Sequence, residues 1–112
     1  MTTQVLSPSY DAFEYAHTAA TTTKIFLLIS SKVVLPLNTA AANETNVFVA
    51  RAPRVRVPKA TGEAWTPMQL IYLKADLSNF TTTATSNTLA GRVVKAAASA
   101  DTEGEIELDP SA

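Results

Sequence analysis

Residues that could carry acid–base chemistry are few in this chain. His17 is the only histidine among the 112 residues, and there is no cysteine. A Ser-His-acid triad would have to be built on His17, and a metal site would have this single imidazole as its nitrogen ligand. If "FEYAH" is extended, His17 shares a face with Phe13 and Tyr15. We therefore predict a packed or interface residue at position 17, and we predict no catalytic residue, no metal and no cofactor.

Acidic residues alternate along the C-terminal stretch "DTEGEIELD". They are Asp101, Glu103, Glu105, Glu107 and Asp109. In a strand these side chains face one side, opposite Ile106 and Leu108. The twelve-residue spacing and the closing glutamate of a calcium loop are missing. Two interpretations stay open for Glu103, Glu105 and Glu107: a solvated face that discourages edge-to-edge aggregation, or an acidic strip that meets a basic one.

Basic residues gather in the middle of the chain, with few acids nearby in sequence. They are Arg51, Arg54, Arg56 and Lys59. Four cations without interleaved aromatic residues are a weak signal for nucleic acid, and the formal net charge of −1 adds no general attraction to it. The pattern favours contact with an acidic protein surface. Exposed ion pairs of this kind set register and partner choice more than affinity.

The elements that position these residues are short strands. Apolar and polar residues alternate, or form short apolar runs, in nine segments: 13–17, 24–29, 33–37, 46–50, 54–58, 68–74, 79–85, 89–96 and 104–109. The segments around "SSK" and "ADLS" read as hairpins, and the strands of the first hairpin are expected to be buried on both faces. The pattern predicts an all-β fold of about eight short strands, a small barrel or sandwich.

We expect one domain, residues 11–112, preceded by an extended arm at residues 1–10, "MTTQVLSPSY". Since aromatic residues are few, the core should consist mainly of Val, Leu, Ile and Ala. The lone tryptophan, Trp65, is expected to close this core, with anchoring of an interface as the alternative. No apolar run approaches the roughly 18 residues that cross a bilayer, and the N-terminus lacks the pattern of a signal peptide.

Two stretches carry a family resemblance: "VPKATGEAW", residues 57–65, and "FTTTATSNTLAGRVVKAAASADTEGEIEL", residues 80–108. Here the chain resembles a family of small phage proteins, some of them labelled recombinase-like, whose members of known role are capsid decoration, or cement, proteins. The resemblance is specific over residues 55–108 and traceable over 12–54. The recombinase label is rejected, because strand exchange driven by ATP needs a GxxxxGK[ST] loop and this sequence has none.

The resemblance implies a structural virion protein, not an enzyme, that binds the outer surface of the expanded capsid and stabilises contacts between major capsid protein subunits. It implies a homotrimer, with neither nucleic acid nor membrane as partner. We expect interface residues in the arm (Val5, Leu6, Pro8 and Tyr10) and in the basic and acidic strips. The alternative is another structural virion component, such as a fibre base or a head-tail joining protein.

The family usually has glycine at its turns, whereas this chain has three glycines in all. Turns that need positive φ are therefore expected at Asn38, Asn43, Asn79 or Asn87, or else reshaped.

Overall fold

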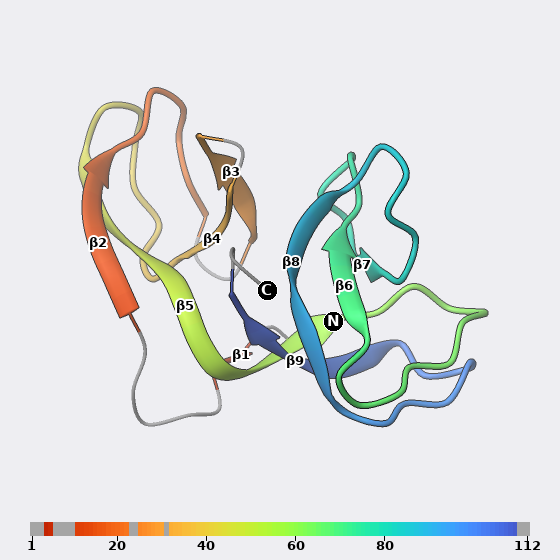
Figure 1. Cartoon of the computed structure of the whole chain (residues 1–112). Helices are drawn as coiled ribbons and strands as arrows, with labels where there is room; N and C mark the ends of the chain where they lie inside the picture. Colours follow the sequence, from red (N-terminus) through yellow and green to blue (C-terminus); the bar gives the residue numbers. More distant parts are fainter. Residues whose placement is uncertain (1–3, 6–10, 23–24, 31, 110–112) are drawn as a thin grey trace.

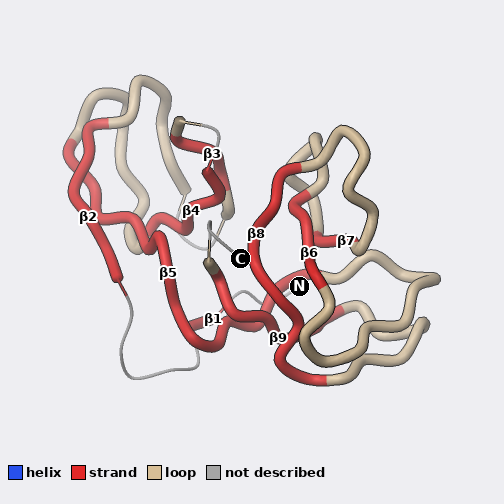
Figure 2. The backbone as a smooth tube through the Cα atoms, viewed as in Figure 1, coloured by secondary structure: helices blue, strands red, loops and turns tan. Residues whose placement is uncertain are grey.

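Nine strands, with no helix among the described residues, make up one sheet (Figure 2). The structure is a computed structural model and describes residues 4–5, 11–22, 25–30 and 32–109. The strands are β1 (Gln4–Val5), β2 (Asp11–Ala16), β3 (Leu27–Ile29), β4 (Lys32–Pro36), β5 (Thr45–Pro58), β6 (Leu70–Leu73), β7 (Phe80–Thr81), β8 (Thr88–Lys95) and β9 (Glu103–Leu108). The all-β prediction is confirmed. In the part of the chain that the structure describes, no helix is long and apolar enough to cross a membrane.

The longest strand, β5, runs through both halves of the sheet (Figure 1). The prediction of two strands, at 46–50 and 54–58, is wrong, because one strand of 14 residues covers both. Pro53 lies in a register shift between Ala52 and Val55, where its missing N–H does not interrupt the pairing. The first half of β5 pairs with β2 and β4, and the second half pairs with β1 and β9.

The sheet curls into a half-barrel. Its strand order is β3-β4-β5-β9-β8-β6-β7, and all pairings between named strands are antiparallel. The curl returns β7 to the end of β5, where Lys59 and Phe80 form an isolated parallel bridge and the Ala60 amide donates to the Phe80 carbonyl at 2.9 Å. The predicted small barrel or sandwich is therefore a curled sheet closed by one bridge.

Both predicted hairpins form. β3 pairs with β4 and β6 pairs with β7, while β6 also pairs with β8. Burial on both faces holds for β4, in which residues 33–36 are buried, but not for β3, whose three residues are only half-buried. β3 is an edge strand of the sheet, so it pairs with one neighbouring strand, β4, and not with two.

The core fills the curl and contains mainly Val, Leu, Ile and Ala, as predicted. Two aromatic rings from distant segments, Phe26 and Phe80, meet edge to face with centroids 4.9 Å apart. Trp65 is 1 % exposed, which confirms its core position.

Positive φ angles occur at one of the predicted asparagines, Asn43. Among the described residues the other non-glycine positions with positive φ are Ser30, Met68, Leu77 and Ser86. Asn38, Asn79 and Asn87 do not adopt this conformation. Leu77 and Ser86, which lie close to Asn79 and Asn87 in the sequence, have positive φ instead.

Candidate functional site

The acidic strand β9 lies between two strands that carry cations. In the register of the sheet, Arg56 of β5 is opposite Glu105, and on the other side Lys95 of β8 is opposite the same glutamate, with Arg92 opposite Glu107. The alternation predicted for this strand is confirmed, since Ile106 and Leu108 are fully buried on the inner face. The outer face of β5, β9 and β8 is therefore a ladder of opposite charges, which we call the charge ladder.

Glu105 is the centre of the charge ladder. Its Oε1 accepts a hydrogen bond from Arg54 Nε, and its Oε2 lies 3.7 Å from Lys95 Nζ. The Glu105 side chain is 11 % exposed, whereas those of Arg54 and Lys95 are 50 % and 65 % exposed. We expected the basic strip to meet an acidic surface of another protein. The structure pairs Arg54 with an acid of the same chain, 51 positions away in sequence. Contact of the basic strip with another protein stays a prediction.

Arg51 belongs to a second ionic cluster. Its Nη2 lies 3.3 Å from Asp109 Oδ1, and its Nη1 lies 3.8 Å from Asp11 Oδ2. The side chains of Arg51 and Asp11 are 50 % and 72 % exposed. Solvent-exposed pairs of this kind contribute about 0–1 kcal/mol each. The basic strip is thus divided between two clusters, and both remain accessible to a partner.

Lys59 is not part of a surface strip, so this element of the prediction is wrong. The residue is 2 % exposed. Its ammonium donates to the carbonyl of Ala60 at 3.0 Å and lies 3.4–3.5 Å from the carbonyls of Ser99 and Asp101. It also lies 5.7 Å from the centroid of the Trp65 ring. Carbonyl dipoles and the face of an aromatic ring replace water around the charge, which makes its burial tolerable.

Glu63, in the same loop, fastens the loop to β7. Its carboxylate accepts hydrogen bonds from Trp65 Nε1 at 3.0 Å, Thr81 Oγ1 at 2.9 Å and the Thr82 amide at 2.8 Å. Burial by itself raises the pKa of Glu63, but these hydrogen bonds and the nearby charge of Lys59 lower it below the usual value. The stretch "PKATGEAW", residues 58–65, therefore has a structural role: it connects the end of β5 to β7 through side-chain hydrogen bonds.

His17 packs among aromatic rings, as predicted. Its ring centroid lies 6.3 Å from that of Tyr15 and 6.5 Å from that of Phe48, and Phe13 stacks on Phe48 at 5.7 Å. The imidazole Nδ1 lies within hydrogen-bond distance of the Ala19 backbone. This cluster covers one face of β2.

We expected interface residues in the N-terminal arm. The part that the structure describes adds a strand to its own sheet, because Gln4 pairs with Arg56 and Val5 pairs with Val55. The Val5 side chain and the whole of Leu6, Pro8 and Tyr10 lie outside the described residues. Their predicted contacts with a partner stay predictions.

The described surface includes the following hollows. One, of about 100 Å³, has the lining residues Arg56, Lys95, Ala96, Ala97, Asp101, Glu103, Gly104 and Glu105. The other, of about 410 Å³, has the lining residues Glu14, Asn38, Thr39, Ala40, Glu44, Thr45, Asn46 and Val47. Both have walls of mixed polar and apolar character. No group of three or more His, Asp or Glu side chains that could hold a metal ion occurs among the described residues.

Sequence reasoning missed the exposed apolar side chains. Large apolar residues exposed by about a third or more are Tyr15, Ile25, Met68, Leu77 and Val94. Met68 is the most exposed of them at 67 %. Pro67 in "TPMQ" indicates a turn, because proline is favoured at the second position of type I and II turns, but no residue type there predicts the positive φ or the exposure of Met68.

These features are those of a small all-β domain with a buried apolar core and an outer face on which opposite charges alternate. A family model described as phage cement protein matches residues 9–108. The chain belongs to the phage cement protein family, which makes it a structural phage protein with a capsid-associated, stabilising role. Comparison with curated proteins and with solved structures gives no match.

Proposed function

We propose that the protein binds the outer surface of the expanded phage capsid and clamps neighbouring major capsid protein subunits. The observation that carries this proposal is the family match, because residues 9–108 include every strand from β2 to β9. The protein acts by binding and not by turnover.

Clamping needs no strong single contact. A binding site that spans two capsid subunits exists only in the assembled shell, so bound protein stabilises the shell by mass action. Contacts repeated over a lattice, or made by several linked subunits, add up through effective concentration. We propose a homotrimer, since three linked copies can engage three neighbouring capsid subunits at once.

The contact residues that we propose lie in two places. The first is the exposed part of the ionic clusters, where the side chains of Arg51 and Arg54 are each 50 % exposed despite their ion pairs. The charge ladder, with Arg56, Glu103 and Glu107, borders them. The second is the arm, through Val5, Leu6, Pro8 and Tyr10. Lys59 is excluded because it is buried.

Co-sedimentation tests the proposal. Purified protein is mixed with expanded shells stripped of it, and with unexpanded shells, and the bound copies per shell are counted at saturation. High-copy binding to expanded shells alone is expected. Binding at a few sites per shell would favour the alternative, a fibre-base or head-tail joining component, and absence of binding to either shell would contradict the proposal. Analytical ultracentrifugation of the free protein tests the trimer.

A further inference from the structure

A tight turn at residues 66–69 holds an apolar side chain in a costly backbone conformation. The Gln69 amide donates to the Thr66 carbonyl at 3.2 Å, Pro67 occupies the second position, and Met68 occupies the third with a φ of 73°. This is the pattern of a type II turn, whose third position normally holds Gly or Asn because a Cβ is disfavoured there.

The turn is pinned to β8, so the conformation of Met68 is fixed. The Met68 amide donates to the Val93 carbonyl at 2.8 Å, and Arg92 Nη1 donates to the Met68 carbonyl at 2.9 Å. The Thr66 amide donates to the side-chain oxygen of Gln69 at 3.2 Å, which closes the turn from the other side. Met68 is therefore presented on a rigid support.

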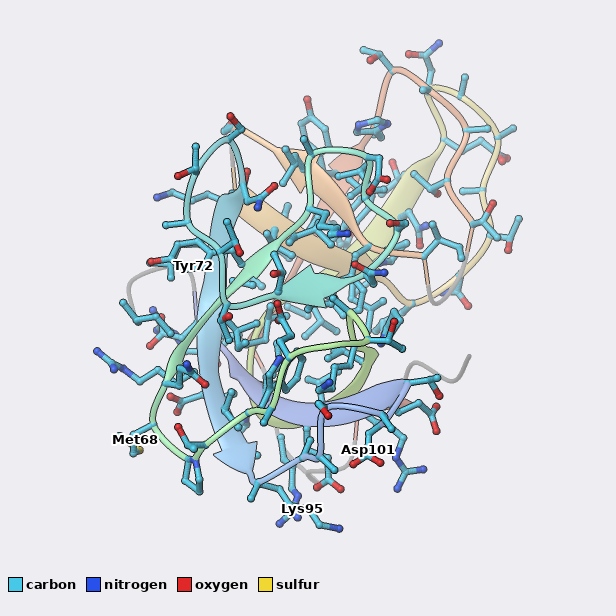
Figure 3. All side chains as sticks on the ribbon, turned by 90° about the vertical axis from the view of Figure 1, so that its right-hand side faces the viewer. Met68, Tyr72, Lys95 and Asp101 are labelled. Carbon is cyan, nitrogen blue, oxygen red and sulfur yellow. The ribbon has the colours of Figure 1, made fainter. Side chains whose placement is uncertain are left out.

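The side chain of Met68 gains little from the domain itself. It is 67 % exposed and projects from the outer margin of the molecule (Figure 3). A single exposed apolar residue is ordinary on a protein surface. An exposed apolar residue with a positive φ is unusual. Glycine at this position would relieve the backbone strain, and the core does not require the side chain of Met68. Strained residues held in place by their surroundings cluster at functional sites.

The surroundings of Met68 present positive charge. Arg92 contacts the turn directly, and Lys95 lies further along the same strand with its side chain 65 % exposed. The carboxylate partner of Lys95, Glu105, is only 11 % exposed, so the cation is the group that a partner meets. Glu107 lies opposite Arg92 and offsets part of its charge. Val94, which lies between the two cations in the sequence, is 36 % exposed.

We propose that Met68 is an apolar anchor that inserts into an apolar pocket of the capsid shell, a pocket whose rim carries carboxylates facing Arg92 and Lys95. The proposal rests on the proposed function and names the contact that the capsid would recognise. An unbranched thioether adapts to the shape of a pocket. Because hydrogen bonds to β8 already fix the backbone of the turn, less conformational entropy is lost when Met68 binds.

The test compares variants of the full chain in two assays, thermal unfolding and co-sedimentation with expanded shells. Met68→Gly removes both the side chain and the strain, and Met68→Leu keeps an apolar side chain. Met68→Gly is expected to keep or raise the Tm while weakening capsid binding about tenfold, the effect of losing one buried apolar side chain. Met68→Leu is expected to bind within about twofold of the unaltered protein.

Leu77→Gly is the matched control. Leu77 also has a positive φ, 63°, at a turn, but it is only 36 % exposed. Its replacement is expected to leave capsid binding unchanged. Met68→Asn, which tolerates positive φ and is polar, must reproduce the loss of binding.

Three results would overturn the inference while wild-type binding persists: full binding by Met68→Gly, an equal loss with Leu77→Gly, or a loss that follows a lowered Tm. If the unaltered protein does not bind expanded shells, the proposed function fails first, and the anchor fails with it.

Discussion

The indole ring of Trp65 lies against the Cα of Gly104, so closely that a Cβ at position 104 would come within 2.3 Å of ring atom Cζ3. Trp65 is 1 % exposed, and the ring has no empty space to move into without displacing the core. We expect Gly104→Ala to lower the free energy of unfolding by about 1–3 kcal/mol through overpacking. Urea unfolding followed by the fluorescence of this single tryptophan measures both the stability and the displacement of the ring.

Gly62→Ala provides the comparison for that variant. Gly62 has a φ of +88° and open space where its Cβ would lie, so alanine there introduces backbone strain only. We expect a loss of about 1–2 kcal/mol with an unchanged native emission maximum of Trp65. An equal shift of the emission maximum in both variants would contradict the assigned contact between the ring and position 104.

Lys59 is expected to be needed for stability and not for capsid binding. Lys59→Met keeps the apolar stem but removes the donor that serves the Ala60 carbonyl. An unsatisfied buried acceptor costs about 1–3 kcal/mol, and this loss should appear as a lower urea midpoint. The exposed Lys95 provides the control, since Lys95→Met should change stability by about 0.5 kcal/mol or less. A stable Lys59→Met protein that has lost capsid binding would restore Lys59 as a contact residue.

Acidification should remove the contribution of Glu63. Its folded pKa lies below the ordinary value of a glutamate, so the stabilisation is present above the unfolded pKa and is lost as the pH falls through the folded pKa. Glu63→Gln should therefore be less stable than the unaltered protein at neutral pH, and the difference should shrink below about pH 4.5. Urea midpoints measured from pH 7 downward check this. A constant difference over that range would show that the charge of Glu63 is not involved.

Glu105 should couple energetically to Arg54. A double-mutant cycle of Arg54→Met and Glu105→Gln is expected to give a coupling energy of about 0.5–1 kcal/mol, which falls at high salt. The cycle of Arg51→Met and Asp11→Asn, whose atoms are 3.8 Å apart and whose side chains are 50 % and 72 % exposed, should give less. Equal coupling in the two cycles would mean that the burial of Glu105 adds nothing to its ion pair.

Removal of residues 1–10 should abolish capsid binding and leave the sheet folded. The deletion takes away the two pairs that β1 makes with β5, and the core residues described from Phe26 to Leu108 all lie outside it. Near-native circular dichroism and an unchanged Trp65 emission spectrum would show that the domain persists. Undiminished co-sedimentation of this truncated protein would contradict a role of the arm in capsid contact.

The alternation of residue types was enough to predict most of the strands and the inner face of β9, because side chains in a strand alternate between faces. It also held the information that places Lys59. Arg54 and Arg56 point outward while Val55 and Val57 are fully buried, so position 59 shares the inward parity of the valines. We predicted Lys59 on the surface because it is charged, although its position in the alternation indicates the inner face. Two of the carbonyls that accept hydrogen bonds from its ammonium, those of Ser99 and Asp101, lie some 40 positions away in sequence.

The ion pairs of Glu105 could not be predicted in the same way. They depend on the register between β9 and its two neighbours, and a shift of two residues would keep the alternation but change every partner. The strained turn at Met68 was likewise hidden, because its positive φ is imposed by hydrogen bonds to β8 and not by the residue type.

The single long strand β5 also has a mechanical consequence. The β2–β4 half and the β9–β8 half share it as one covalent segment, with the irregularity at Pro53 but no loop between them. A load applied along this strand would pull on the hydrogen bonds of both halves in shear, in parallel, instead of peeling them apart one by one. A protein that stabilises a capsid would gain from such a strand, because force would pass from one half of the domain to the other with no loop between them.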